Sequence, residues 1–291
     1  MRLSYLIPYL LILPIFFLIF LIVSYPITSV LITSFYKTRY GIKLDNFIGL
    51  ENFFQLIKYP LFWLAIKNSI IWTIGNIILQ LFISLSVGIL LNQDIKGKTF
   101  FQTAVLIPWI TPAVASAIIW RFMLEPTIGI INRLLLNLGL IKSPILFLGK
   151  ADNAMLSVIF INSWMHAPIG ILLVIAALQT IPKEILDATE MDISATWQKY
   201  RYVIFPLMIS RIAFIGLLLF IWNFNAFTII WLTTQGGPGD ATTTLPVLVY
   251  RLGFRMFNAG QSAAISTLMA LVSLIYGLLY FKYSERGEQY E

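Results

Sequence analysis

The sequence predicts an all-α, polytopic integral membrane protein with six main transmembrane helices. The first observation is composition, because 59% of the 291 residues are hydrophobic and only 11% are charged, whereas soluble domains are about 45–50% apolar and about 25% charged. The second is a mean hydropathy of +0.85. The third is a set of six runs without Asp, Glu, Lys or Arg, each longer than the roughly 20 residues that span a bilayer. One transmembrane domain over residues 1–291 is therefore expected.

The six uncharged runs cover residues 3–36, 68–93, 99–120, 153–182, 212–239 and 256–281. The first run is too long for one straight span, and Pro8, Pro14 and Pro26 predict a kink in it. It also exceeds the apolar core of a signal peptide and lacks a small-x-small cleavage site, so we expect a retained first helix. Buried helices of a soluble core would be fewer and shorter, and the strands of a membrane barrel alternate in polarity over about 10 residues.

The chain carries few groups suited to catalysis or metal binding. It has no Cys and a single His, His166, which excludes disulfides, thiolate metal sites and multi-histidine centres. No acid lies in the run around His166, so a Ser–His–Asp arrangement is not expected. Gly97-Lys98-Thr99 matches the end of a phosphate-binding loop, but that motif needs a Gly five residues earlier, where this chain has Asn92. We therefore expect no catalytic residue, no metal site and no cofactor on this chain.

The charge distribution indicates contact with membrane lipids and not with nucleic acid. The net charge of +7 favours anionic headgroups, and the basic residues are too scattered to form a nucleic-acid-binding stripe. If both termini are cytoplasmic, nine of the 20 Lys and Arg residues fall on the inner side, where the loops are shorter. We expect this orientation, with outer loops near residues 37–60, 125–152 and 233–260.

The segment 180–206, between the fourth and fifth runs, is named the coupling element below. It holds four of the 13 acids of the chain within nine residues, and Pro182 suits the first turn of a helix. Ile185, Ala188 and Thr189 follow helical spacing and form a small apolar face. A second short helix, capped by Ser194, is expected to end before Pro206. Periodicity alone leaves two interpretations open: an ordinary interfacial loop, or a docking element for a soluble partner.

The coupling element resembles the EAA loop of binding-protein-dependent ABC importer permeases. The residues that match are Asp187-Ala188-Thr189, Asp192-Ile193-Ser194, Trp197, Tyr200, Val203 and Pro206. Ile193 stands where the family has Gly, a residue that permits a left-handed turn between the two helices. Either the turn is built differently here, or coupling to the ATPase through this subunit is weaker. The resemblance implies that Pro182, Asp187, Ala188, Asp192, Trp197 and Tyr200 contact an ATPase subunit.

A second stretch resembles the carbohydrate subgroup of the same family. It is Leu232-Thr233-Thr234-Gln235-Gly236-Gly237-Pro238, followed by Thr242-Thr243-Thr244-Leu245-Pro246. Read physically, the glycines and Pro238 form a turn after a helix, and Thr242–Thr244 form a polar exit from the bilayer. Gly129-Ile130-Ile131-Asn132 and the stretch 258–266 continue the likeness.

The resemblance implies a type I ABC importer permease fold and a permease subunit like the F-type chain of maltose and trehalose importers, in the cell membrane. The implied partners are a second homologous permease subunit, two ATPase subunits that bind ATP and Mg, and an extracellular sugar-binding protein. A di- or oligosaccharide such as maltose or trehalose is the implied cargo, and glycerol phosphate is the narrower alternative. A phosphate would require Arg or Lys in the cavity, and Arg211 is the nearest candidate.

Polar side chains in the fourth and fifth runs are candidates for substrate binding. Amides and imidazoles in hydrocarbon are costly, so they either face a cavity or bond between helices, and both alternatives stay open. Matching to the maltose-type permeases points to Asn162, Met165, His166, Ile169, Trp222 and Asn223.

Two other classes of membrane protein are disfavoured by the residues. A secondary transporter usually carries acids within its spans, and these runs contain none. A membrane enzyme would need clustered reactive groups, and no such cluster is apparent in the sequence.

Overall fold

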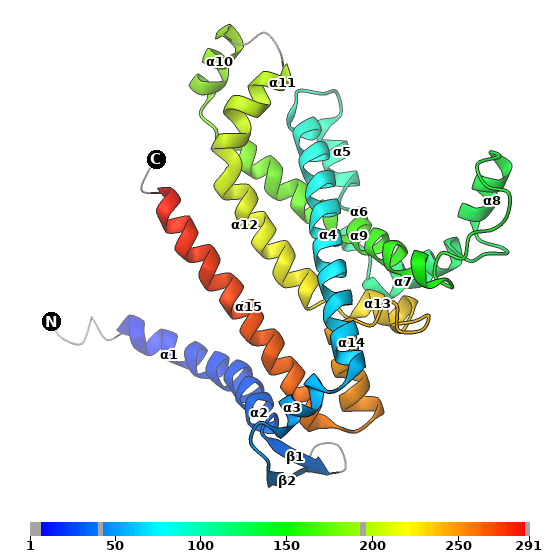
Figure 1. The fold of residues 1–291 in the computed structure, drawn as a ribbon. Coiled ribbons are helices and arrows are strands. Elements are labelled where there is room, and N and C mark those ends of the chain that lie inside the picture. Colours follow the sequence, from blue (N-terminus) through cyan, green and yellow to red (C-terminus); the bar gives the residue numbers. More distant parts are fainter. Residues whose placement is uncertain (1–6, 40–42, 193–195, 289–291) are drawn as a thin grey trace. The chain divides into compact units, whose positions relative to one another are not determined.

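The computed structural model describes residues 7–39, 43–192 and 196–288, and most of them are helical (Figure 1). The chain forms two compact units, one from Met1–Trp63 with Leu248–Val272 and one from Leu64–Val247 with Ser273–Glu291. Five helices in the described ranges are long and apolar enough to cross a membrane, and a bent helix pair supplies a sixth crossing if it counts as one span. The prediction of an all-α membrane fold is confirmed.

The long apolar helices are Leu11–Thr33, Pro60–Asn92, Ala151–Gln179, Trp197–Phe224 and Ala259–Lys282. The full element order is α1 (Ile7–Ile19), η1 (Phe20–Ser24), α2 (Tyr25–Thr33), β1 (Tyr36–Arg39), β2 (Lys43–Phe47), α3 (Glu51–Ile57), α4 (Pro60–Asn92), α5 (Lys98–Ala104), α6 (Ile107–Ile110), α7 (Ala113–Met123), α8 (Ile130–Asn137), α9 (Ala151–Gln179), α10 (Lys183–Asp192), α11 (Thr196–Lys199), η2 (Tyr200–Ile204), α12 (Phe205–Phe224), α13 (Thr228–Thr233), α14 (Leu245–Tyr250), η3 (Arg251–Arg255) and α15 (Ala259–Glu288).

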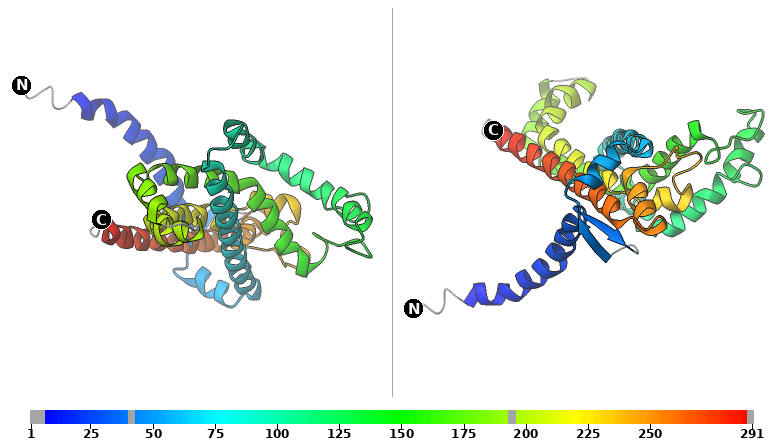
Figure 2. Two further views of the ribbon diagram at one scale, coloured as in Figure 1. Left: turned by 90° about the horizontal axis from the view of Figure 1, so that it is seen from above. Right: turned by 60° about the horizontal axis from the view of Figure 1, so that its bottom comes forward.

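In the first unit, the opening apolar run is an α-helix interrupted by the π-helical turn η1. Pro26 lies two residues after this turn. It lacks an N–H and its ring clashes with the carbonyl four residues earlier, so a wider turn accommodates it. The run leads into a β-hairpin that the sequence did not predict (Figure 2). In this hairpin Tyr36 pairs with Phe47, and the centroids of their rings are 5.4 Å apart. Asn52 Nδ2 of α3 donates to Ser34 O at 2.8 Å and to Tyr36 O at 3.0 Å, which holds the hairpin.

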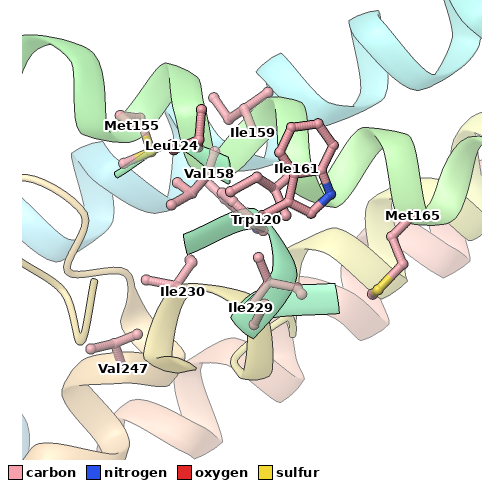
Figure 3. Close-up of a cluster of buried hydrophobic side chains, with 12 residues drawn as sticks. Trp120, Leu124, Met155, Val158, Ile159, Ile161, Met165, Ile229, Ile230 and Val247 are labelled. Atoms are coloured by element: carbon pink, nitrogen blue, oxygen red, sulfur yellow. The ribbon is translucent and has the colours of Figure 1, made fainter. Parts of the chain in front are cut away.

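In the second unit, an apolar cluster joins α7, α9 and α13 (Figure 3). Trp120 of α7 is 7% exposed, and its ring makes edge contacts with Phe160 and Trp164 of α9, each at 5.4 Å between centroids. Ile229 and Ile230 of α13 complete the cluster. This packing fixes the helices that carry the candidate site.

The third predicted span, residues 99–120, is not one straight helix. Its two parts, Lys98–Ile110 and Ala113–Met123, meet at 91°. The backbone at Thr111 is extended, with ψ of 127°, because the ring of Pro112 disfavours the helical conformation of the residue before it.

The fifth predicted span, residues 212–239, was wrong in both bounds. The observed helix runs from Trp197 to Phe224 and so includes Lys199, Arg201 and Arg211. Long basic side chains near a helix end can extend toward the interface, so a charge does not end a membrane helix. Arg211 instead donates to Leu207 O at 2.8 Å.

The Gly97-Lys98-Thr99 segment is a helix-to-helix turn, which agrees with the interpretation from sequence. Gly97 has φ of +78°, a left-handed conformation that favours glycine, and it precedes α5. Lys98 Nζ donates to Asn92 O at 2.9 Å at the C-terminal end of α4, where a cation is favourable.

A tight turn at residues 125–132 connects α7 to α8. The Glu125 carboxylate accepts N–H bonds from Ile128 at 2.6 Å and Thr127 at 2.7 Å, and the Thr127 hydroxyl bonds it at 2.8 Å. The bond from Ile128 and then that from the hydroxyl lower the pKa of Glu125, so the carboxylate stays ionised at neutral pH. Buried Asn132 then exchanges two bonds with the backbone of Ile145 at 2.8 and 3.0 Å, closing the loop.

We expect Gly129→Ala to destabilise this turn by about 1–3 kcal/mol, because backbone atoms cannot give way as side chains do. A Cβ at Gly129 would lie 2.6 Å from Met123 O and would also meet Glu125 O. Thermal unfolding in detergent measures the effect. Gly216→Ala is the control, since a Cβ there meets nothing within 4 Å, and an equal melting temperature for the two variants would contradict the expectation.

Candidate functional site

A cavity of about 640 Å³ opens between α9, α12 and the segments that carry α6 and α13. This volume lies within the usual range of small-molecule sites. Its lining consists of Trp109, Ala113, Asn162, Met165, His166, Ile221, Trp222, Asn225, Ala226, Phe227, Thr228 and Ile229. No described residue of this lining is charged.

Four of the six predicted substrate residues line this cavity: Asn162, Met165, His166 and Trp222. The other two do not. Ile169 is half-buried outside the lining, and Asn223 is buried at 3% exposure behind it. Sequence alone therefore located the two helices of the cavity but not which of their faces lines it.

Asn223 belongs to a buried amide network that joins three membrane-spanning helices. Its Nδ2 donates to Gln80 Oε1 of α4 at 2.9 Å, and its Oδ1 accepts from Asn162 Nδ2 of α9 at 2.8 Å. Asn162 Nδ2 also donates to Asn76 Oδ1 at 2.7 Å. For Asn223 the structure thus shows bonding between helices, one of the two alternatives left open. The sequence analysis missed Asn76 and Gln80. They are amides four residues apart in an uncharged run, which is the same kind of pattern that pointed to Asn162 and Asn223.

The network leaves acceptors at the cavity. Both N–H groups of Asn162 are bonded, while its Oδ1 accepts no hydrogen bond from the described residues. His166 Nδ1 lies 3.0 Å from Asn162 O. A carbonyl only accepts, so Nδ1 carries the proton and Nε2 is left with a lone pair. Hydroxyl donors match these acceptors.

Aromatic side chains supply apolar surface in the same cavity. Trp222 is 44% exposed and Trp109 is 49% exposed. Phe227 also lines the cavity, with its ring stacked on Trp231 at 5.5 Å. Trp109 reaches the cavity only because the third span is bent at Pro112, so no sequence signal of helical spacing could have placed it there.

The coupling element begins with the predicted helix, now α10. Pro182, which directly precedes α10, is exposed, as are Asp187 and Ala188 on α10, and Trp197 of α11 is 66% exposed. The Asp192 side chain, Ile193 and the predicted cap Ser194 lie outside the described part of the chain.

The apolar face predicted for α10 is divided between two environments. Ile185 and Ala188 are exposed, whereas Thr189 is 6% exposed and bonds Ile185 O. Leu186, which was not assigned to that face, packs on the hydrophobic cluster around Ile204. One side of α10 is therefore held by the protein while the other is free.

The second short helix does not end before Pro206, as had been predicted. It continues through the π-helical turn η2 into α12. The missing N–H and the ring of Pro206 are accommodated by the wider turn before it, as at η1. Tyr200 of this turn is half-buried and packs on the same hydrophobic cluster as Leu186.

The Gly-Gly-Pro-Gly turn is fastened to the start of α4. Asn68 Nδ2 donates to Asp240 O at 3.0 Å and to Thr243 O at 3.1 Å. Thr242, Thr243 and Thr244 are at most 1% exposed. Their side chains are therefore buried against the protein, and the polar exit from the bilayer at these threonines stays a prediction.

An array of apolar helices, an uncharged cavity between them and a helical element exposed on one side define a multi-pass membrane transport protein. The chain belongs to the family of binding-protein-dependent transport system inner membrane components, whose model matches residues 80–286.

Relatives and solved structures agree over nearly the full length. The chain is 31% identical to the "Probable ABC transporter permease protein" of Brucella suis over 97% of this chain and 98% of that protein. It is 28% identical to the "Trehalose/maltose transport system permease protein MalF" of Thermococcus litoralis, covering 94% of this chain and 92% of that protein. A bacterial ABC transporter involved in the import of the acidic polysaccharide alginate has the same fold, with a TM-score of 0.83 at 20% identity, over 96% of this chain and 95% of that chain.

Proposed function

We propose that this chain is the permease subunit of an ATP-driven importer that carries a neutral di- or oligosaccharide, of the maltose and trehalose kind, into the cytoplasm. The observation that carries the proposal is the uncharged cavity, which combines aromatic faces with unused acceptors. Trp109 and Trp222 offer flat surfaces for the apolar faces of a pyranose ring. Asn162 Oδ1 and His166 Nε2 would accept from sugar hydroxyls.

The chemistry of the cavity favours a neutral cargo over an anionic one. A phosphate or uronate group would be stabilised by Arg or Lys, and the described lining contains neither. Arg211, the candidate cation, is bonded to Leu207 O and is not part of the lining. Glycerol phosphate and acidic polysaccharides are therefore less well matched than a neutral sugar.

The proposed assembly contains a second homologous permease subunit, two ATPase subunits and an extracellular sugar-binding protein, with ATP and Mg bound by the ATPases. Its termini are cytoplasmic in this proposal. Support comes from the family, whose members serve binding-protein-dependent transport, from the free side of α10, where Asp187 and Ala188 are exposed, and from the exposed Trp197 of α11. That surface would dock on the ATPase.

ATP hydrolysis by the assembly reconstituted in lipid tests the function. The chain is purified with its neighbouring subunits and mixed with the binding protein and each sugar of a panel. Stimulation by one neutral sugar supports the proposal. If no ATPase co-purifies and uptake instead follows an ion gradient, the chain is a secondary transporter and the proposal is wrong.

We expect Trp222→Ala to reduce uptake of that sugar roughly two- to tenfold, since an aromatic contact contributes about 0.5–1.5 kcal/mol. Basal ATP hydrolysis should not change. Trp63→Ala is the matched control because Trp63 is 54% exposed and does not line the cavity. Equal losses of sugar uptake in the two variants would mean that Trp222 does not contact the sugar.

A further inference from the structure

The short helix α8 presents an apolar face that the protein does not cover. Ile130 and Leu134 of α8 and its C-cap residue Leu138 follow one another at four-residue spacing and are 63%, 57% and 62% exposed. The opposite side of the helix is held in place by Asn132, which is 1% exposed and bonded to Ile145. The exposed stripe therefore belongs to an anchored helix, and its direction is fixed.

Within residues 130–150 the charge has a single sign, whereas Glu125 and Asp152, which flank this segment, are acidic. Residues 130–150 contain Arg133, Lys142 and Lys150 and no acid. Lys150 pairs with Asp152 at 3.2 Å, while Arg133 and Lys142 are exposed and have no ion pair within the described residues. Arg133 and Asn137 border the apolar stripe on α8, so the exposed part of the helix has an apolar arc beside a polar, basic edge.

In the chain, α8 lies in the loop that leads directly into a membrane-spanning helix. The loop that carries α8 ends at Lys150, and α9, a membrane-spanning helix, begins at Ala151 (Figure 1). The same loop lines a second cavity of about 460 Å³, bounded by Leu124, Ile131, Phe147, Leu156 and Phe160. No described residue of that cavity is charged, so hydrocarbon suits it.

We propose that α8 lies in the membrane interface and binds anionic phospholipid, with Ile130, Leu134 and Leu138 among the acyl chains and Arg133 and Lys142 at the headgroups. A helix with an apolar arc and a basic edge lies in the interface plane in this way. Anionic headgroups are favoured because each basic residue near a charged surface adds to the attraction. The segment that sequence assigned to an outer loop thus faces lipid along one side.

The absence of Cys in the chain permits a direct test on the full-length protein. Leu134→Cys is labelled with an environment-sensitive fluorophore in the assembly as purified, and reconstituted into vesicles of phosphatidylcholine with or without phosphatidylglycerol. Asn137→Cys, on the polar edge of α8, is the matched control. Lipids with a nitroxide in the acyl chain should quench the label at position 134 at least twofold more than the label at position 137.

Selectivity for the headgroup is measured with nitroxide carried on phosphatidylglycerol or on phosphatidylcholine. We expect quenching at position 134 to favour phosphatidylglycerol, by roughly fivefold for each basic residue that contributes. The preference should disappear in the Arg133→Gln/Lys142→Gln variant. Because sugar-stimulated ATP hydrolysis is not the readout, this test is separate from that of the proposed function.

Two outcomes would overturn the proposal. Equal quenching of both positions by aqueous iodide would place α8 in water. A label at position 134 that is shielded from both quenchers, or becomes so when the binding protein is added, would mean that a protein partner covers the stripe.

Discussion

Replacing Asn76 by alanine is expected to lower stability by about 3 kcal/mol, more than most single substitutions do. Three donors converge on Asn76 Oδ1: Asn162 Nδ2 at 2.7 Å, Ser163 Oγ at 3.0 Å and Gln80 Nε2 at 3.3 Å. Each buried donor that loses its acceptor costs roughly 1 kcal/mol in a membrane bundle. Asn76 is 0% exposed, so water cannot replace the lost acceptor.

The effect should extend to transport, because the same oxygen fixes the position of Asn162. Without it, Asn162 keeps one partner on α12, Asn223 Oδ1, and is free to rotate its unused acceptor away from the cavity. The measurements are reversible unfolding in mixed detergent and sugar-stimulated ATP hydrolysis. Both should fall in Asn76→Ala.

The control for the unfolding measurement alone is Asn225→Ala, because Asn225 lines the cavity. Asn225 is exposed, and its Nδ2 donates locally to Ile221 O at 2.8 Å, so the loss of this side chain should cost well under half as much. Asn76→Asp should be milder than alanine, since a neutral acid can accept from the three donors and still donate to Trp72 O, as Asn76 does. If alanine and aspartate destabilise equally, the convergent bonds contribute little.

Neutralising the acids of the coupling element is expected to uncouple the assembly without dissociating the permease pair. In the Asp187→Asn/Asp192→Asn variant, we expect binding-protein-stimulated ATP hydrolysis to fall roughly tenfold, equivalent to about 1.4 kcal/mol. Asp187 is exposed on the free side of α10, so its change should not disturb the buried contacts of Leu186 and Thr189.

Trp197 provides a second probe of the coupling element. Trp197→Ala removes a side chain that is 66% exposed, and Gln198→Ala removes its exposed neighbour on α11. Large aromatic residues carry much of the binding energy at protein interfaces, so only Trp197→Ala should lower stimulated hydrolysis. Co-purification of the subunits is the control for assembly. Unchanged stimulation in the double-Asp variant and in Trp197→Ala would show that coupling runs through another surface.

The third and fifth predicted spans show why charge-free runs predict spans but not their geometry. The run 99–120 is uncharged throughout, yet the conformation at Thr111 and Pro112 bends it by 91°. The run 212–239 begins after Arg211, yet the helix begins at Trp197, because basic side chains extend along a helix toward water. Hydropathy indicates whether a segment lies in lipid or in water. Where a helix begins, bends and ends depends instead on backbone hydrogen bonding and on the positions of prolines.

The candidate site shows a similar division. Asn162, Met165, His166 and Trp222 could be located from polar and aromatic residues in uncharged runs, and they do line the cavity. Asn223 carried the same signal, but it is buried and bonded to Gln80. An amide in a membrane helix must find a partner, and the sequence cannot say whether that partner is a ligand or another helix.

By itself, the sequence determined the membrane class, the helical composition and the family motifs, because a bilayer demands long apolar helices that satisfy their own backbone hydrogen bonds. Only the tertiary structure decided which faces meet. It bent the third span so that Trp109 reaches the cavity, closed the amide network of Asn76, Asn162 and Asn223, and left the stripe on α8 uncovered. These outcomes depend on the rotation of each helix about its axis, and packing against distant segments sets that rotation.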